Sequence, residues 1–81
     1  MRVYEVPKGE SGIRHGLVMM AVEGVEDVVQ GVAQGLEASG FPSTACSDYG
    51  DKMGEVIEYF MVNRSEVSEF KAIFRHLKQT F

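Results

Sequence analysis

The stretch VEDVVQGVAQGLEAS at residues 25–39 decides the fold, because a helical period appears here between two segments with strand-like patterns. At about 100° per residue, its apolar side chains fall on one stripe and its polar side chains on another. The apolar stripe consists of Val25, Val28, Val29, Val32, Ala33 and Leu36. The polar stripe, which is mostly acidic, consists of Glu26, Asp27, Gln30, Gln34 and Glu37. This pattern predicts a helix from Val25 to Ser39 that packs one side against a core.

A strip of three small residues, Gly31, Gly35 and Ala38, separates the two stripes at the spacing i, i+4, i+7. An interior glycine costs a helix roughly 0.5–1 kcal/mol relative to alanine, so two on one edge indicate close packing by another body. We expect that body to be the last helix of the same chain, since the Gly-x-x-x-Gly dimer motif belongs to membrane helices. The alternative is a close contact with a second copy or a foreign partner.

Two strands are predicted before this helix. Arg2–Val6 has a strand-like pattern that ends at Pro7, and Ile13–Val22 is a second strand with a continuously apolar end. The short loop between them favours an antiparallel hairpin. Glu23-Gly24 is expected to break the second strand.

Two more strands are predicted after the helix. Gly40 stands where a glycine commonly ends a helix, and Pro42 prevents continuation. Ser43–Tyr49 is weakly strand-like and polar enough for a sheet edge. Glu55–Val62 alternates strongly between two side-chain rows and predicts a longer strand.

The last segment predicts a terminal helix, capped by Asn63 or Ser65. Its apolar face consists of Val67, Phe70, Ile73, Phe74, Leu77 and Phe81. The order ββαββα predicts an α+β fold: a four-stranded antiparallel sheet, order 1-2-4-3, with two helices on one face. Two alternatives stay open, namely another edge for the third strand or a sandwich completed by dimerisation. In outline the arrangement resembles half-ferredoxin and ACT-type modules.

Size and charge limit the class of protein. The 81 residues, 44% of them hydrophobic, predict a single domain over residues 1–81. The net charge of −4 argues against nonspecific binding to nucleic acid or an anionic membrane. The longest apolar run, Leu17–Val22, is too short to span a bilayer, and the N-terminal residues show no apolar signal region. A cytoplasmic location is therefore expected.

No motif in the chain indicates a chemical reaction. Cys46 is the only cysteine, and neither His15 nor His76 has a His or Cys partner at metal-ligand spacing. No nucleophile–base pair or phosphate-binding glycine pattern is present. We therefore predict no catalytic residue, no metal site and no cofactor.

Two charged surfaces are candidates for binding. Asp48, Tyr49 and Asp51 lie around the third loop and, together with the polar stripe of the first helix, form the predicted partner-binding surface. On the last helix a basic ridge, which we define as Lys71, Arg75 and Lys78, is a candidate for binding a small anion. The simpler interpretation of this ridge is a solvated face that complements the helix C-terminus.

These features predict a small non-enzymatic protein-binding module that acts as an inhibitor or adaptor. Small size, acidity and the lack of a catalytic motif resemble the profile of phage and mobile-element inhibitors, including anti-CRISPR-like proteins. The resemblance implies that the chain occludes a larger basic target, such as a nucleic-acid-handling complex, without binding nucleic acid directly. The alternative function is a dimeric small-molecule-sensing domain of ACT-like outline, and a homodimer is compatible with either.

Overall fold

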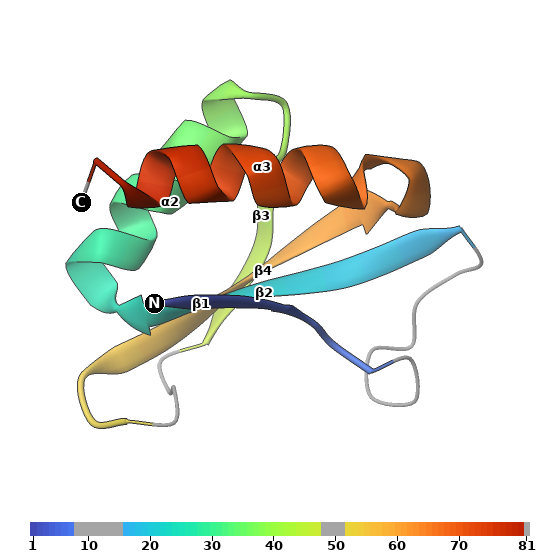
Figure 1. The fold of residues 1–81 in the computed structure, drawn as a ribbon. Helices are drawn as coiled ribbons and strands as arrows, with labels where there is room; N and C mark the ends of the chain where they lie inside the picture. The colour runs from blue at the N-terminus through green and yellow to red at the C-terminus, as the bar shows by residue number, and fades with distance from the viewer. Residues whose placement is uncertain (8–15, 48–51, 81) are drawn as a thin grey trace.

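The predicted order of strands and helices is present in the structure, a computed structural model that describes residues 1–7, 16–47 and 52–80 (Figure 1). The elements in chain order are β1 (Arg2–Glu5), β2 (Leu17–Val25), α2 (Glu26–Ala38), β3 (Ser43–Ser47), β4 (Glu55–Asn63), the 3₁₀ helix η1 (Arg64–Glu66) and α3 (Val67–Lys78). The four strands form one antiparallel sheet in the order β1-β2-β4-β3. The predicted α+β fold and its 1-2-4-3 sheet are therefore confirmed.

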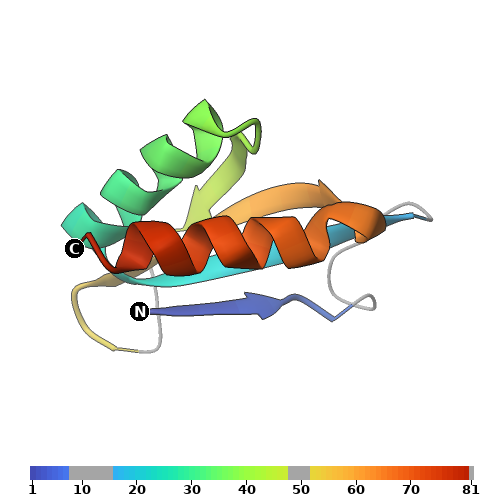
Figure 2. The same cartoon turned by 45° about the horizontal axis from the view of Figure 1, so that its top comes forward.

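Both helices cover the same face of the sheet, with α3 on the β1 side and α2 on the β3 side (Figures 1 and 2). The core between the two layers includes Met20, Leu36 and Phe60, all fully buried. The ring of Phe70 from α3 lies 5.3 Å from that of Phe60 and 5.4 Å from that of Phe41 (centroid distances). The aromatic side chains of α3 thus hold this helix on the sheet, as its apolar face predicts.

The register between β2 and β4 assigns side chains to the two faces of the sheet. Met20 pairs with Phe60, and Val22 pairs with Glu58. Because directly paired residues share a face, Glu58 belongs to the side-chain row that faces the helices. Glu23 pairs with Arg2 and with Ile57, and this row faces away from the helices.

The predicted break at Glu23-Gly24 is wrong, because β2 continues to Val25 and pairs with β4 along its whole length. Gly24 makes room for a neighbour instead of ending the strand. A Cβ atom added there would lie 3.2 Å from the side chain of Met1. The predicted beginning of this strand at residues 13–15 lies outside the described residues, and β2 begins at Leu17.

The helix ends agree with the sequence in one case and differ in the other. Gly40 has a φ of 97°, the left-handed conformation expected of a glycine just after a helix. The predicted cap of the last helix by Asn63 or Ser65 is wrong, because Arg64–Glu66 folds as η1 and neither helix has a side-chain cap. Asn63 instead donates a hydrogen bond from Nδ2 to Oε1 of Glu66, over 2.8 Å.

Candidate functional site

The predicted acidic stripe of α2 is exposed and borders a groove, which we call the acidic groove. Its polar residues Glu26, Asp27, Gln30, Gln34 and Glu37 are all exposed. The groove has a volume of about 170 Å³ and is lined by Gln30, Ala33, Gln34, Glu37, Ser43 and Glu58. The structure thus brings three of the predicted partner-binding residues together with Ser43 of β3 and Glu58 of β4.

Glu58 lines the groove because of its position on β4. It is half-buried in the β4 row that faces the helices, between the buried residues Val56 and Phe60. Within the described part of the chain, neither Glu58 nor Glu37 makes an ion pair. The groove therefore presents two uncompensated carboxylates to a ligand.

The position of Glu37 on α2 does not favour the helix. Glu26 and Asp27 lie in its first turn, where negative charge is stabilised by the helix dipole. Glu37 lies in its last turn, which holds no basic residue. A carboxylate at that end is unfavourable by about 0.3–1 kcal/mol. Helix stability thus accounts for Glu26 and Asp27 but not for Glu37.

The acidity of this region has a signal in the sequence that the helical pattern alone does not reveal. Residues 15–51 contain six acidic residues and no lysine or arginine. The predicted partner-binding residues Asp48, Tyr49 and Asp51 belong to this stretch but lie outside the described residues. A second signal is Glu58 itself, an acid within an otherwise apolar strand row.

The small-residue strip of α2 includes a close contact between the two helices. A Cβ atom added at Gly35 would lie 2.6 Å and 2.8 Å from the two Cδ atoms of Leu77 in α3. Gly31 is half-buried, and Ala38 is exposed at the end of α2. The absence of a side chain at Gly35 is what allows Leu77 to approach the backbone of α2.

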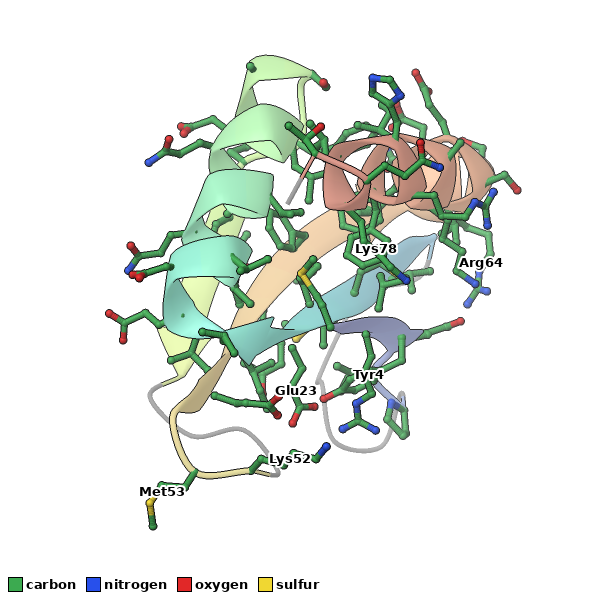
Figure 3. All side chains as sticks on the ribbon, turned by 60° about the vertical axis from the view of Figure 1, so that its left-hand side comes forward. Tyr4, Glu23, Lys52, Met53, Arg64 and Lys78 are labelled. Carbon is green, nitrogen blue, oxygen red and sulfur yellow. The ribbon has the colours of Figure 1, made fainter. Side chains whose placement is uncertain are left out.

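The basic ridge lies away from the acidic groove, on α3. Lys71 is half-buried, whereas Arg75 and Lys78 are exposed. Figure 3 shows Lys78 and Arg64 on the side of the molecule formed by α3 and β1, opposite α2. The acidic groove and the basic ridge are therefore on different helices, and Arg64 is paired with Glu5 of β1 at a distance of 3.1 Å.

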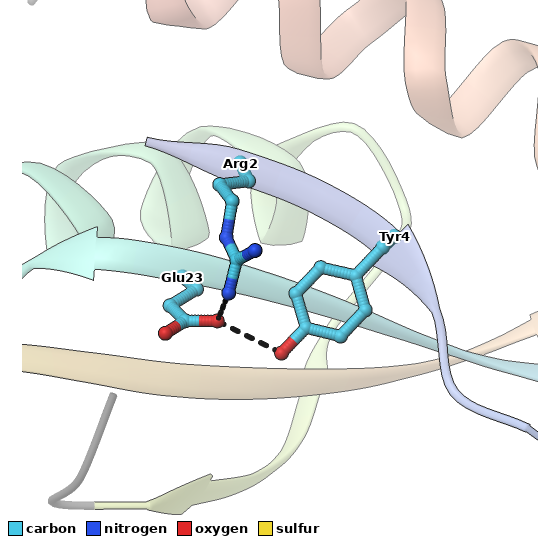
Figure 4. A network of polar contacts seen from close by, with 3 residues as sticks. All are labelled: Arg2, Tyr4 and Glu23. Carbon is cyan, nitrogen blue, oxygen red and sulfur yellow. Dashed lines mark hydrogen bonds and ion pairs between the residues drawn. The ribbon is translucent and has the colours of Figure 1, made fainter. Parts of the chain in front are cut away.

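A buried carboxylate lies on the face of the sheet away from the helices (Figure 4). Glu23 is 1% exposed and is the only buried charged residue in the described ranges. Arg2 donates from Nη2 to Oε1 of Glu23 over 2.6 Å, and the hydroxyl of Tyr4 donates to the same oxygen over 2.9 Å. The guanidinium of Arg2 also lies 5.2 Å from the centroid of the Tyr4 ring.

This cluster changes the acidity of Tyr4. Burial, together with the hydrogen bond to Glu23 and the negative charge of Glu23, raises the pKa of the Tyr4 hydroxyl to about 12. The hydroxyl of Tyr4 therefore stays protonated over the physiological pH range and continues to donate its hydrogen bond to Glu23. The sequence interpretation missed the cluster, although the alternation of Arg2 and Tyr4 along β1 is a signal that both face the same side.

Comparison with known proteins adds no relative: no protein-family model, curated protein or solved structure matches this chain. Among the residues that the structure describes, no three His, Cys, Asp or Glu side chains are grouped to hold a metal ion. None of the helices in those same ranges is long and apolar enough to cross a membrane.

Proposed function

We propose that this chain is a non-enzymatic protein-binding module whose acidic groove receives a basic side chain of a larger partner. The observation that carries the proposal is the pair Glu37 and Glu58, two carboxylates with no ion-pair partner in the described chain that line one groove. Both occupy places where a charge is costly, one at a helix C-terminus and one in a core-facing strand row. Sites that sacrifice stability in this way are commonly retained for binding.

The dimensions and chemistry of the groove fit one arginine or lysine side chain. Its volume of about 170 Å³ accommodates a guanidinium or ammonium group with part of its stem, but not a large cofactor. The two carboxylates accept charge-assisted hydrogen bonds, and Gln30 and Gln34 add amide acceptors beside them. A planar guanidinium, with five N–H donors, satisfies such a set of acceptors better than an ammonium does.

The class of partner follows from the same charges. An acidic surface favours a partner with a basic surface, and nucleic-acid-handling complexes carry such surfaces. Occlusion of a basic surface is the action of an inhibitor or adaptor of the phage or mobile-element type, and the cytoplasm is where such a complex is met. Electrostatic association of this kind is fast at low salt and slows as salt rises.

The proposal is tested by capturing the partner from cell extract with two matched double variants. Glu37→Gln with Glu58→Gln removes both groove carboxylates, whereas Glu66→Gln with Glu69→Gln removes the same charge from η1 and α3. The first variant should lose a partner that the wild type retains at low salt, and the second should keep it. Equal retention by both variants would show that the groove does not bind the partner.

A further inference from the structure

The strand β3 forms the edge of the sheet on the side covered by α2, directly beside the acidic groove (Figures 1 and 2). It pairs with β4 on one side, and no described strand pairs with its other side. Ser43, Thr44, Ala45 and Cys46 are all exposed. An edge strand offers main-chain N–H and C=O groups on its outer side to a further strand. This edge is therefore a place where an extended segment can join the sheet.

The two edges of the sheet differ in their protection against such pairing. Proteins commonly protect an edge strand with charged side chains, proline or a bulge. Two of the four residues of β1, Arg2 and Glu5, are charged, whereas the five residues of β3 are all small and uncharged. A bulge lies between Ser43 and Ala45, but the pairing of β3 with β4 is regular from Ala45 to Ser47. Small side chains leave the backbone of β3 accessible to another strand.

The register places the groove within reach of a strand added beside β3. Cys46 pairs with Glu58, so both belong to the row of side chains that faces the helices. An added residue opposite Cys46 would share this row at two strand spacings, or about 10 Å, from Glu58. A long side chain such as that of arginine or lysine spans this distance, whereas a short one does not. Gln30, Gln34 and Glu37 of α2 form the other wall of the same groove.

The distribution of charge favours a basic segment at this edge over a second copy of the chain. The basic residues that the structure describes lie on β1, before β4, on η1 and on α3, and they are Arg2, Lys52, Arg64, Lys71, Arg75 and Lys78. None of them is on α2, β3 or β4, the elements that line the groove. Pairing of two β3 edges would bring the acidic stripes of two α2 helices together, and like charges repel. A basic segment would instead compensate Glu37 and Glu58.

We propose that the acidic groove receives its basic side chain from an extended segment of the partner, which adds a fifth strand to the sheet beside β3. Main-chain hydrogen bonds to β3 hold the segment, and every second side chain of the segment lies on the side of α2. One arginine or lysine of that row contacts Glu37 and Glu58. This inference rests on the proposed function, but a helix or loop of the partner could supply the basic side chain without adding a strand.

The test uses the peptide acetyl-TVRVTV-amide, whose β-branched residues favour an extended strand. Titrated into ¹⁵N-labelled protein, it should give saturable NMR shifts at the amides of residues 30–37, 43–47 and 58–60. Two isomers carry N-methyl groups on the odd-numbered or on the even-numbered peptide residues, so that each isomer blocks one edge of the peptide. One isomer should bind at least about tenfold more weakly than the unmodified peptide, because hydrogen bonds to β3 are lost. The other should bind about as tightly as the unmodified peptide.

The side chain in the groove is tested separately from the backbone. Replacement of the peptide arginine by glutamine should weaken binding to the wild type about three- to tenfold. The same replacement should have little effect on binding to Glu37→Gln with Glu58→Gln, because the carboxylates are already gone. Glu66→Gln with Glu69→Gln is the matched control and should behave as the wild type does. The spectra also report whether each variant is folded.

Three results would overturn the added strand: no saturable shifts at β3, equal binding of the two methylated isomers, or a dimer in light scattering whose dilution shifts the amides of residues 43–47. Equal binding of the isomers with a retained dependence on Glu37 and Glu58 would still support the proposed function. Discrimination between the isomers without any dependence on Glu37 and Glu58 would contradict the proposed function, and with it the contact in the groove.

Discussion

At the scale of single residues, the burial of Glu23 is tolerated because two donors from β1 reach one of its oxygens. An ionised carboxylate removed from water without partners would cost several kcal/mol. Arg2 supplies a charge-assisted hydrogen bond, and Tyr4 supplies a second bond to the same atom. The cluster therefore joins β1, an edge strand of only four residues, to the centre of the sheet.

Two arginines with equally exposed side chains allow a measurement of how the burial of Glu23 affects the free energy of unfolding. The side chains of Arg2 and Arg64 are both 56% exposed, but their partners differ, because Glu23 is 1% exposed and Glu5 is 40% exposed. Arg2→Met should lower the free energy of unfolding by about 1–3 kcal/mol, since it leaves a buried carboxylate short of a donor. Arg64→Met should lower it by less than about 1 kcal/mol. Urea denaturation measures both, and equal losses would contradict the role assigned to Glu23.

Tyr4 predicts a specific response to alkaline pH. Its pKa is about 12 in the folded protein and 10.0 in its ordinary state, so between these values the unfolded chain loses a proton that the folded chain keeps. The contribution of Tyr4 to stability is therefore complete below pH 10 and declines as the pH rises toward 12. Tyr4→Phe should be less stable at neutral pH, and its stability should fall less steeply above pH 10.

Ultraviolet titration of the folded protein checks this directly. The chain has three tyrosines, and the one with the highest titration midpoint should be missing in Tyr4→Phe. If the variant instead loses a tyrosine that titrates near pH 10, the hydrogen bond to Glu23 does not persist in solution.

At the scale of elements, the contact between α2 and α3 depends on the missing side chain of Gly35. A valine there would place its Cβ 2.6 Å from a Cδ atom of Leu77 and add two methyl groups to a filled space. Gly35→Val should therefore destabilise the protein by about 1–3 kcal/mol, despite the lower backbone entropy cost of a residue other than glycine. Gly35→Ala should be close to neutral, because its helix propensity offsets a contact that the flexible end of Leu77 can relieve.

A double-mutant cycle separates the contact from general effects on the helix. In a Leu77→Ala background the cost of Gly35→Val should fall by at least half, because the clashing atoms are gone. Thermal or urea denaturation of the four proteins gives the coupling. If Gly35→Val destabilises the Leu77→Ala background as much as the wild type, the effect of the valine does not come from contact with Leu77.

The elements that could be predicted from the sequence are those with one buried side, because burial of one side gives the apolar residues a regular spacing. In α2 and β4 the periods of 3.6 and 2 follow from one buried side, so both could be recognised locally. The end of β2 could not be recognised locally, because the pair Glu23-Gly24 is typical of a turn. The burial of Glu23 depends on hydrogen-bond donors that are 21 and 19 residues away in the sequence. Glu58 is conspicuous in the sequence as an acid in an apolar strand row, but its position beside α2 depends on the pairing of β4 with its neighbouring strands.

At the scale of the whole molecule, the sheet order separates the acidic groove from the basic ridge. Because β1 and β3 are the two edges of the sheet, α3, which carries the basic ridge, lies on the β1 side, and α2 lies on the β3 side (Figure 2). The acidic groove is lined by residues of α2, β3 and β4. Neither helix can neutralise the other through side chains on these outer faces. Local patterns indicate the charge of each helix, but the distance between the two surfaces is a property of the assembled sheet alone.

This separation predicts that removing the groove carboxylates stabilises the fold. Glu37→Gln with Glu58→Gln eliminates a charge at a helix C-terminus and another in a core-facing row, so the free energy of unfolding should rise by about 0.5–1.5 kcal/mol at low salt. The gain should shrink as salt screens the remaining acids of residues 15–51. Glu66→Gln with Glu69→Gln should give no gain, because these acids lie at the N-terminal end of α3, where the helix dipole favours them. Urea denaturation of all three proteins at two salt concentrations measures these changes in the free energy of unfolding. A groove variant that is less stable than the wild type would mean that Glu37 and Glu58 stabilise the fold, and would contradict this prediction.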